Sequence, residues 1–371
     1  MNNEFYIRRA IRLAAKARGM TSPNPMVGAV IVKNGEIISE DFHRKPGTSH
    51  AEALAIEKAG EKAKGSTLYV SLEPCCHTEK RTPPCTRTII NAGIKRVIIG
   101  MRDPNPKVSG RGILELQRAG IVVKSGILED KAKKLNEIYI KYITSGRPFV
   151  ILKIAMTLQG NIATPEGQSK WITGEKARRI VHRLRSRVDA IMTAIGTVKA
   201  DDPQLTARIK GGKNPRRIVI DPDLEIPVDA KILQIPPETI IITRKSEVIR
   251  QRRKKSKVEG KKKILSGKGV QIITYEGKKV NLDWLMKRLG NMGIASVLLE
   301  GGSSLNAHAL EDGIVDKVMF FIAPKIIGGR RSFPAVGGET YKKIEESVKI
   351  TDLRIKKIGE DFLIEGYVKK R

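Results

Sequence analysis

Short apolar runs alternate with helical patterns over the first 145 residues. Residues 27–32 form a β-branched run, and Asn34–Gly35 after it is a typical hairpin turn before a partner strand at 37–42. Helical spacing and further apolar runs then predict helices at 4–18, 51–59, 86–92, 112–119 and 130–143, and strands at 67–71, 97–100 and 122–124. Strands separated by helices predict an α/β sandwich.

The pattern breaks at Ser145–Gly146–Arg147–Pro148, which predicts one domain over 1–145 and a second over 146–371. The second half alternates again. Its predicted helices lie at 175–186, 283–289 and 304–310, and its predicted strands at 149–156, 190–193, 217–220, 239–243, 270–274, 296–300, 318–322, 347–355 and 361–368. The whole chain is therefore predicted to be α/β, without an internal repeat.

Composition adds a strong positive charge to this picture. Seventy Lys and Arg stand against 39 Asp and Glu, which gives a net charge of +31 and a field that attracts anions. The tract from Arg244 to Lys263 is the most basic part and lacks apolar periodicity, so we expect a solvated surface insertion there. Aromatic residues make up only 4% of the chain, which leaves few stacking surfaces for single-stranded nucleic acid. Nucleic acid and phosphorylated small substrates both remain possible partners for such a charge.

The sequence predicts neither a membrane protein nor a secreted one. No apolar run approaches the roughly 20 residues that span a bilayer. Glu4, Arg8 and Arg9 interrupt the N-terminal segment, which predicts an amphipathic helix and not a signal peptide. A cytoplasmic location is therefore expected. All three cysteines fall within residues 75–85, and a tight cluster in a reducing compartment favours metal binding.

One histidine and the cysteines have the pattern of a catalytic zinc site, which needs about three protein ligands and an open position. His50–Ala51–Glu52 matches one half of the zinc-deaminase signature, and Glu73–Pro74–Cys75 begins the other half. His50 and Cys85 both stand at predicted helix starts, where the helix field stabilises thiolates. Zn²⁺ is therefore a predicted cofactor, and Glu52 remains available to move protons.

Further motifs follow in a characteristic order. They are Pro23–Asn24–Pro25, EPCCHTEKRTPPC, Arg102–Asp103–Pro104–Asn105–Pro106, Ser169–Lys170–Trp171–Ile172–Thr173, Gly196–Thr197–Val198, Ala200–Asp201–Asp202–Pro203 and Glu300–Gly301–Gly302. With them the chain resembles the bifunctional riboflavin-biosynthesis deaminase/reductase family over nearly its full length. The resemblance implies a cytidine-deaminase-like α/β/α sandwich followed by a dihydrofolate-reductase-like α/β domain.

For the first domain, the resemblance implies zinc ligands at His50, Cys75 and Cys85, with Glu52 as the catalytic proton shuttle. The chain departs from the family in having one extra residue between its two cysteines. Cys75 is preferred because it follows Glu73–Pro74, whereas Cys76 would restore the commoner spacing and is the alternative.

The resemblance also implies that Asn24 and His43 bind substrate and that His77 lies near the pyrimidine. The plainer interpretations are a turn former for Asn24 and a surface histidine for His43. Asp103 and Asn105 can equally be turn formers.

The second domain lacks a GxGxxG loop, and its best local signal is Glu300–Gly301–Gly302 before a helix whose N-terminus could hold a phosphate. The resemblance implies NADPH as cofactor. It places cofactor contacts at Ala155, Trp171, Thr197, Asp201, Gly302, Ser303, Ser304, Leu305, Asn306, Ala307 and His308. It places substrate contacts at Ser169, Arg185, Leu205, Arg208, Glu300 and Lys153. Core packing is the plainer interpretation of Trp171, and Gln159 replaces the family's usual aspartate in a turn.

The implied reactions are successive. Zinc-dependent hydrolysis removes the 2-amino group of 2,5-diamino-6-ribosylamino-4(3H)-pyrimidinone 5′-phosphate, and NADPH then reduces the ribosyl group to a ribityl chain. The expected partners are this phosphorylated pyrimidine and NADPH, and a homo-oligomer is compatible with the sequence. The alternatives are a tRNA or nucleotide zinc deaminase with an accessory C-terminal domain, and a structural zinc protein that binds nucleic acid through residues 244–263.

Overall fold

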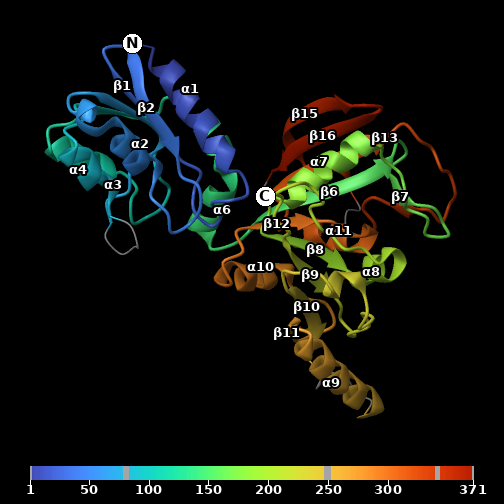
Figure 1. Cartoon of the computed structure of the whole chain (residues 1–371). Coiled ribbons are helices and arrows are strands. Elements are labelled where there is room, and N and C mark those ends of the chain that lie inside the picture. Colours follow the sequence, from blue (N-terminus) through green and yellow to red (C-terminus); the bar gives the residue numbers. More distant parts are fainter. Residues whose placement is uncertain (1, 78–82, 246–251, 339–342, 370–371) are drawn as a thin grey trace. The chain divides into compact units, whose positions relative to one another are not determined.

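The computed structural model describes residues 2–77, 83–245, 252–338 and 343–369 (Figure 1). The chain divides into two compact units, Met1–Arg147 and Pro148–Arg371. None of the helices in the described part is both long enough and apolar enough to cross a membrane.

A five-stranded sheet forms the centre of the first unit. In spatial order its strands are β2 (Glu36–Phe42), β1 (Gly28–Lys33), β3 (Thr67–Leu72), β4 (Arg96–Met101) and β5 (Val122–Lys124). β1 runs antiparallel to β2 and β3, whereas β3, β4 and β5 are parallel. Asn34 and Gly35 have φ angles of 52° and 87°, as the predicted hairpin turn requires.

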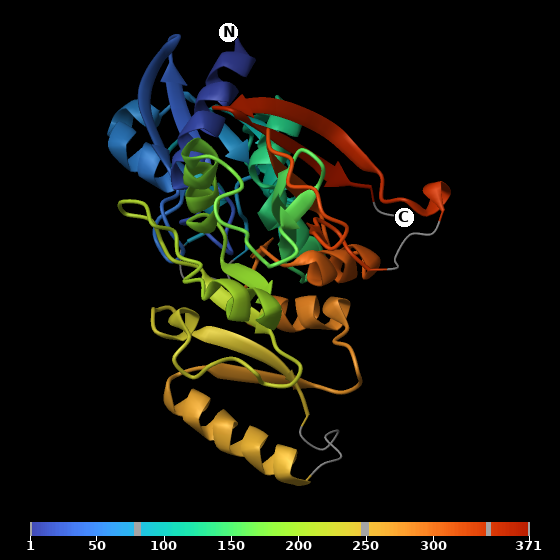
Figure 2. The same cartoon turned by 90° about the vertical axis from the view of Figure 1, so that its right-hand side faces the viewer.

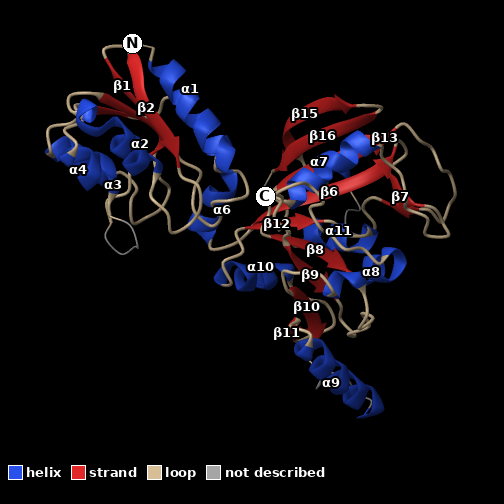
Figure 3. Ribbon diagram, viewed as in Figure 1, coloured by secondary structure: helices blue, strands red, loops and turns tan. Residues whose placement is uncertain are grey.

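Helices cover both faces of this sheet (Figure 3). Because successive side chains of a strand point to opposite faces, Val30 and Tyr69 pack with α1 (Asn3–Ala14), while Ile31 and Val70 pack with α2 (Ala51–Ala59). Residues of α3 (Cys85–Asn91) and α4 (Arg111–Arg118) join the α2 side. The predicted α/β/α sandwich is confirmed.

The single helix predicted at 130–143 is wrong, because two helices occupy this segment. They are α5 (Glu129–Leu135) and α6 (Glu137–Ser145), and Asn136 joins them with a backbone at φ −101° and ψ 21°. The Asn136 side chain bonds instead to the backbone of Met26, 110 residues away in the sequence. Apolar periodicity cannot reveal such a contact.

A nine-stranded sheet forms the second unit, in the order β11–β10–β9–β8–β12–β6–β13–β16–β15. Their bounds in chain order are β6 (Phe149–Thr157), β8 (Ala190–Ala194), β9 (Arg216–Ile220), β10 (Thr239–Arg244), β11 (Gln271–Tyr275), β12 (Ser296–Leu299), β13 (Lys317–Ala323), β15 (Ile350–Ile358) and β16 (Asp361–Val368). The neighbouring strands from β11 to β13 are parallel to one another. β16 pairs antiparallel with β13, and β15 pairs antiparallel with β16. The pair β7 (Asn161–Ala163) and β14 (Phe333–Pro334) was not predicted.

Five α-helices lie between the strands in the described part of this unit. They are α7 (Glu175–Arg185), α8 (Ile195–Asp201), α9 (Arg252–Gly267), α10 (Leu282–Asn291) and α11 (Ser303–Glu311). The sequence predicted a solvated surface insertion over Arg244–Lys263 and assigned no helix to it. Residues 246–251 of this tract lie outside the described residues, and α9 begins at Arg252 within the rest of it. Helix α9 lies beside β11 (Figure 2), and Leu265 near its C-terminal end is fully buried. A charged helix anchored near one end does not produce the amphipathic stripe by which helices are recognised.

Candidate functional site

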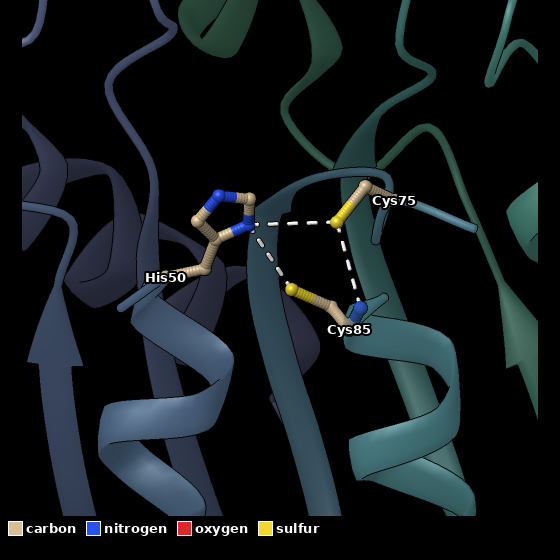
Figure 4. A group of neighbouring side chains, drawn as sticks. All are labelled: His50, Cys75 and Cys85. Carbon is tan, nitrogen blue, oxygen red and sulfur yellow. Dashed lines mark hydrogen bonds between the residues drawn. The ribbon is translucent and has the colours of Figure 1, made fainter. Parts of the chain in front are cut away.

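Three candidate metal ligands meet at one edge of the five-stranded sheet (Figure 4). His50 is the N-cap of α2, Cys75 follows β3, and Cys85 is the first residue of α3. The Nδ1 atom of His50 lies 3.2 Å from Cys85 Sγ and 3.4 Å from Cys75 Sγ, and the three ligand atoms all lie within 4.8 Å of one another. Tetrahedral zinc, at about 2.0 Å from nitrogen and 2.3 Å from sulfur, would place such atoms roughly 3.5 Å apart. The cluster therefore fits zinc.

The two neighbouring cysteines differ in direction. Cys75 points into the cluster, and its sulfur accepts a hydrogen bond from the Cys85 backbone N–H at 3.5 Å, which suits a thiolate. Cys76 instead lies with its sulfur 4.0 Å from the backbone oxygen of Lys107, and burial raises the pKa of its thiol. The geometry therefore favours Cys75 over Cys76 as the ligand.

The serine variants of these two cysteines are expected to differ sharply. Cys75→Ser should lose most of the bound zinc, since a ligand thiolate is removed, whereas Cys76→Ser should keep about one zinc ion per chain. Metal analysis of both purified variants, after dialysis against the same buffer, measures this. Equal zinc content in the two variants would contradict the choice of Cys75.

Glu52 is a buried carboxylate beside the cluster. It is 3% exposed, interacts with the Cys85 side chain, and has one oxygen, Oε2, with no hydrogen-bond partner in the described part of the chain. Burial and the neighbouring Cys75 raise its pKa. A buried oxygen that still lacks a donor fits a group that receives a proton from a molecule bound at the open metal position.

His43 also lies beside the cluster, so the plainer interpretation as a surface histidine is wrong. It is 3% exposed, and its ring centroid lies 5.2 Å from that of His50. Its Nδ1 lies 3.2 Å from the Ser49 backbone oxygen, while Nε2 is buried without a partner among the residues described. Burial lowers the pKa of His43, which favours the neutral ring. Asn24 donates its backbone N–H to Thr21 at 2.7 Å, in agreement with a turn.

Glu73 was named only as part of the Glu73–Pro74–Cys75 motif, and no role was predicted for it. In the structure it connects the loop that carries Cys75 to a second loop. Its buried carboxylate accepts backbone N–H groups of Asp103, Gly110 and Ile113 at 3.1 to 3.2 Å. Asp103 and Asn105 act as turn formers, because each accepts the N–H two residues ahead. Burial raises the pKa of Asp103 to about 6. The only sequence signal for Glu73 was its place just before Pro74–Cys75.

A second candidate site lies where β12 ends in the nine-stranded sheet. Glu300 follows that strand, and Arg185 of α7 donates two hydrogen bonds to it at 2.7 and 2.9 Å. Lys153 of β6 donates a third bond at 3.1 Å. Burial alone would raise the pKa of Glu300, but Arg185 and Lys153 hold it well below its usual range. Three residues predicted separately as substrate contacts therefore form one buried ion cluster, at the strand ends where α/β sheets bind ligands.

The loop after α8 carries backbone strain. Asp202, Leu205 and Arg208 have φ angles of 40°, 51° and 51°, a region that side chains larger than glycine's disfavour. Arg185 donates to the backbone oxygen of Thr206 at 3.3 Å and helps to hold this loop. Such strain concentrates at functional sites. The Leu205 side chain is buried and that of Arg208 is exposed.

The residues predicted to contact the cofactor differ in exposure. Trp171 is 62% exposed under the Arg178 guanidinium, 4.5 Å from the ring centroid, so core packing is wrong for it. Ser169 donates to Asp201 at 2.9 Å. Thr197 lies on α8, and Ala155 lies half-buried on β6.

The glycine-rich turn places Gly302 as the N-cap of α11, followed by Ser303 and Ser304 at the helix start. The remaining predicted contacts, by contrast, lie in the interior: these buried side chains are Leu305, Asn306, Ala307 and His308. Asn306 donates to the Ala335 backbone oxygen at 2.8 Å. A direct side-chain contact with a cofactor is therefore supported only for the start of the helix.

Gln159, which replaces the family's usual aspartate, keeps a structural role. Its Oε1 accepts the backbone N–H groups of Ile327 and Gly328 at 2.8 and 3.0 Å. An amide oxygen accepts such bonds as a carboxylate does, so the turn remains anchored to the loop that follows β13.

Two family models match the chain, one in each unit. Residues 1–101 match the cytidine and deoxycytidylate deaminase zinc-binding region, and residues 148–364 match the RibD C-terminal domain. The riboflavin biosynthesis protein RibD of Actinobacillus pleuropneumoniae is 46% identical over 99% of this chain and 96% of its own length. Its counterpart in Aquifex aeolicus is 44% identical, over 97% of this chain and 96% of its own.

Solved structures agree over the same length. Acinetobacter baumannii RibD has a TM-score of 0.87 and 34% identity, with 99% of each chain covered. A protein of Thermotoga maritima described as a diaminohydroxyphosphoribosylaminopyrimidine deaminase/5-amino-6-(5-phosphoribosylamino)uracil reductase has a TM-score of 0.83 and 37% identity, also with 99% of each chain covered.

Proposed function

Because the chain belongs to the RibD family of bifunctional riboflavin-biosynthesis enzymes, we propose that His50, Cys75 and Cys85 hold its zinc ion and that Glu52 moves protons beside it. The chain is a deaminase and a reductase, which act with zinc and NADPH. We place the deaminase in the first unit and the reductase in the second. The observation that carries the proposal is the buried Glu52 Oε2, which has no hydrogen-bond partner among the described residues and lies beside three converging candidate ligand atoms.

The deaminase substrate is 2,5-diamino-6-ribosylamino-4(3H)-pyrimidinone 5′-phosphate in this proposal. When bound, zinc supplies Lewis-acid activation of water. Glu52 accepts one proton from the attacking water and passes it to the ring nitrogen. It then accepts a second proton, from the hydroxyl group that the water has become on the ring carbon, and passes it to the amino group, which departs as ammonia. His43 offers its Nε2 to a polar group of the pyrimidine, since that atom is buried and lacks a partner in the described structure. Asn24 lies on the loop before β1 and contributes a second polar contact.

The second unit takes the deaminated product in the proposed sequence. When bound, NADPH supplies the hydride. Arg185 and Arg208 provide charge near the strained loop for the ribosyl phosphate. Trp171 offers an exposed ring to the cofactor, and the Glu300 cluster fixes Lys153 beside the ribose. These residues act by positioning the two reactants, which can by itself lower a barrier strongly.

Removal of zinc should separate the two activities. After treatment with a chelator, we expect ammonia release from the diaminopyrimidine phosphate to stop, whereas NADPH oxidation with the already deaminated substrate continues. Added zinc should restore ammonia release. The two rates are measured separately on one preparation, and a loss of NADPH oxidation on chelation would contradict the assignment of one site to each unit.

The alternative of a tRNA or nucleotide deaminase with an accessory domain is not favoured. It would leave the second unit without a role, while residues 148–364 match the RibD C-terminal domain. Absence of NADPH oxidation with the deaminated substrate would reopen it.

A further inference from the structure

Two loops lie at the same edge of the first sheet as the metal-ligand cluster. One precedes β1 and carries Asn24, and the other follows β4 and carries Asp103. Because β1 runs antiparallel to β3 and β4 runs parallel to it, the start of β1 and the end of β4 both lie where Cys75 follows β3. These two loops therefore border the proposed deaminase site.

Asn136 holds the first loop. Its side-chain oxygen accepts the Met26 backbone N–H at 2.8 Å, and its side-chain nitrogen donates to the Met26 backbone oxygen at 3.0 Å. The residue is only 1% exposed, and it interrupts the helix that the sequence predicted. The Asn136 amide therefore holds both the N–H and the backbone oxygen of Met26, which lies two residues after Asn24.

Tyr139, the third residue of α6, holds the second loop. Its hydroxyl donates to Asp103 Oδ1 at 2.7 Å, and both side chains are buried. The backbone of the same loop is held by Glu73, which accepts the N–H groups of Asp103 and Gly110. Burial and Asp103 raise the pKa of Tyr139, so its hydroxyl remains a donor at neutral pH. Asp103 is thus held through its side chain by Tyr139 and through its backbone by Glu73.

In each contact, the residue that holds the loop lies outside the part of the unit that matches the zinc-binding region. The match to the deaminase zinc-binding region ends at residue 101, whereas Asn136 and Tyr139 lie beyond it. The three candidate ligands come from α2, the loop after β3 and α3, all within residues 50–85. Loss of either contact should therefore disturb the loops and leave the ligands in place.

We propose that Asn136 and Tyr139 are positioning residues of the deaminase, which fix the two loops beside the zinc cluster in the arrangement that binds the pyrimidine. The inference rests on the proposed function of the first unit. It assigns a role to the α5–α6 junction that the zinc-binding region alone does not contain.

The test uses Tyr139→Phe and Asn136→Leu in the full-length, zinc-loaded protein. Each removes hydrogen bonds and preserves much of the side-chain volume, and we expect KM for the diaminopyrimidine phosphate to rise about five- to tenfold. The value of kcat should change less than KM, zinc content should stay at one ion per chain, and NADPH oxidation should stay unchanged. Tyr6→Phe is the matched control and should leave KM unaltered, because the Tyr6 hydroxyl donates to the Gly35 backbone oxygen at 2.7 Å, in the turn at the other end of β1.

An unchanged KM in Tyr139→Phe would overturn the role of Tyr139, and loss of zinc from it would show a structural role instead. Tyr139→Phe decides alone if Asn136→Leu does not fold, because it removes a single oxygen atom. Failure of the proposed function is distinguishable, since the zinc-loaded wild-type protein would then release no ammonia. If the wild-type protein deaminates normally and the KM of both variants is unchanged, only the positioning role is contradicted.

Discussion

Replacement of Glu52 by glutamine is expected to lower deaminase turnover by about 10²- to 10⁴-fold. The amide has nearly the same shape as the carboxylate but cannot accept and return a proton. Glu52 is 3% exposed and is not one of the three clustered ligands, so the zinc ion should remain bound. Ammonia release at saturating substrate, metal content and NADPH oxidation are the three quantities to measure.

Glu57 offers the matched control, because it lies on the same helix α2 and its side chain is exposed. Glu57→Gln should deaminate at the wild-type rate. A Glu52→Gln protein that keeps zinc and more than a tenth of the wild-type turnover would refute the role of Glu52 as proton shuttle. Loss of zinc from this variant would instead identify Glu52 as a metal ligand.

Replacement of Glu300 by glutamine is expected to reduce the free energy of unfolding of the second unit by about 3–5 kcal/mol. The variant would leave Lys153 and Arg185 with no carboxylate, although their side chains are only 14% and 13% exposed. Unfolding by urea, followed with a probe in the second unit, measures the difference. The control is Glu225→Gln, whose partner Lys199 is half exposed, and it should change the free energy by no more than about 1 kcal/mol.

The stability difference between wild type and Glu300→Gln should also depend on pH. The folded pKa of Glu300 is held below its usual value of 4.5, so the unfolded chain binds a proton first as the pH falls. The stabilisation from Glu300 is therefore complete above the usual value and diminishes below it. The two proteins should converge in stability under acid conditions, and a difference that stays constant below pH 4.5 would exclude the ion cluster as its source.

Much of the first site was predictable because its chemical groups lie close together in short segments of the sequence. His50–Ala51–Glu52 stands at a helix start, and the structure begins α2 at Ala51. Cys85 follows two prolines and likewise begins α3. The hairpin at Asn34–Gly35 and most helices and strands also followed from spacing and turn residues. Each of these features depends on side chains within a few positions of one another, so a single sequence contains them.

Only the tertiary structure decided features that join distant segments. It directed Cys75 into the cluster and Cys76 towards Lys107, it ended a predicted helix at Asn136, and it buried His43. It also brought Glu300 onto Arg185 and Lys153, 115 and 147 residues away, where the sequence had suggested three independent contacts. The order of strands in a sheet sets which of these residues meet, and no local pattern of apolar and polar positions encodes that order. The sequence by itself thus determined much of the pattern of helices and strands and the chemistry of the candidate metal ligands, whereas the packing of the sheets determined which side chains hold one another in place.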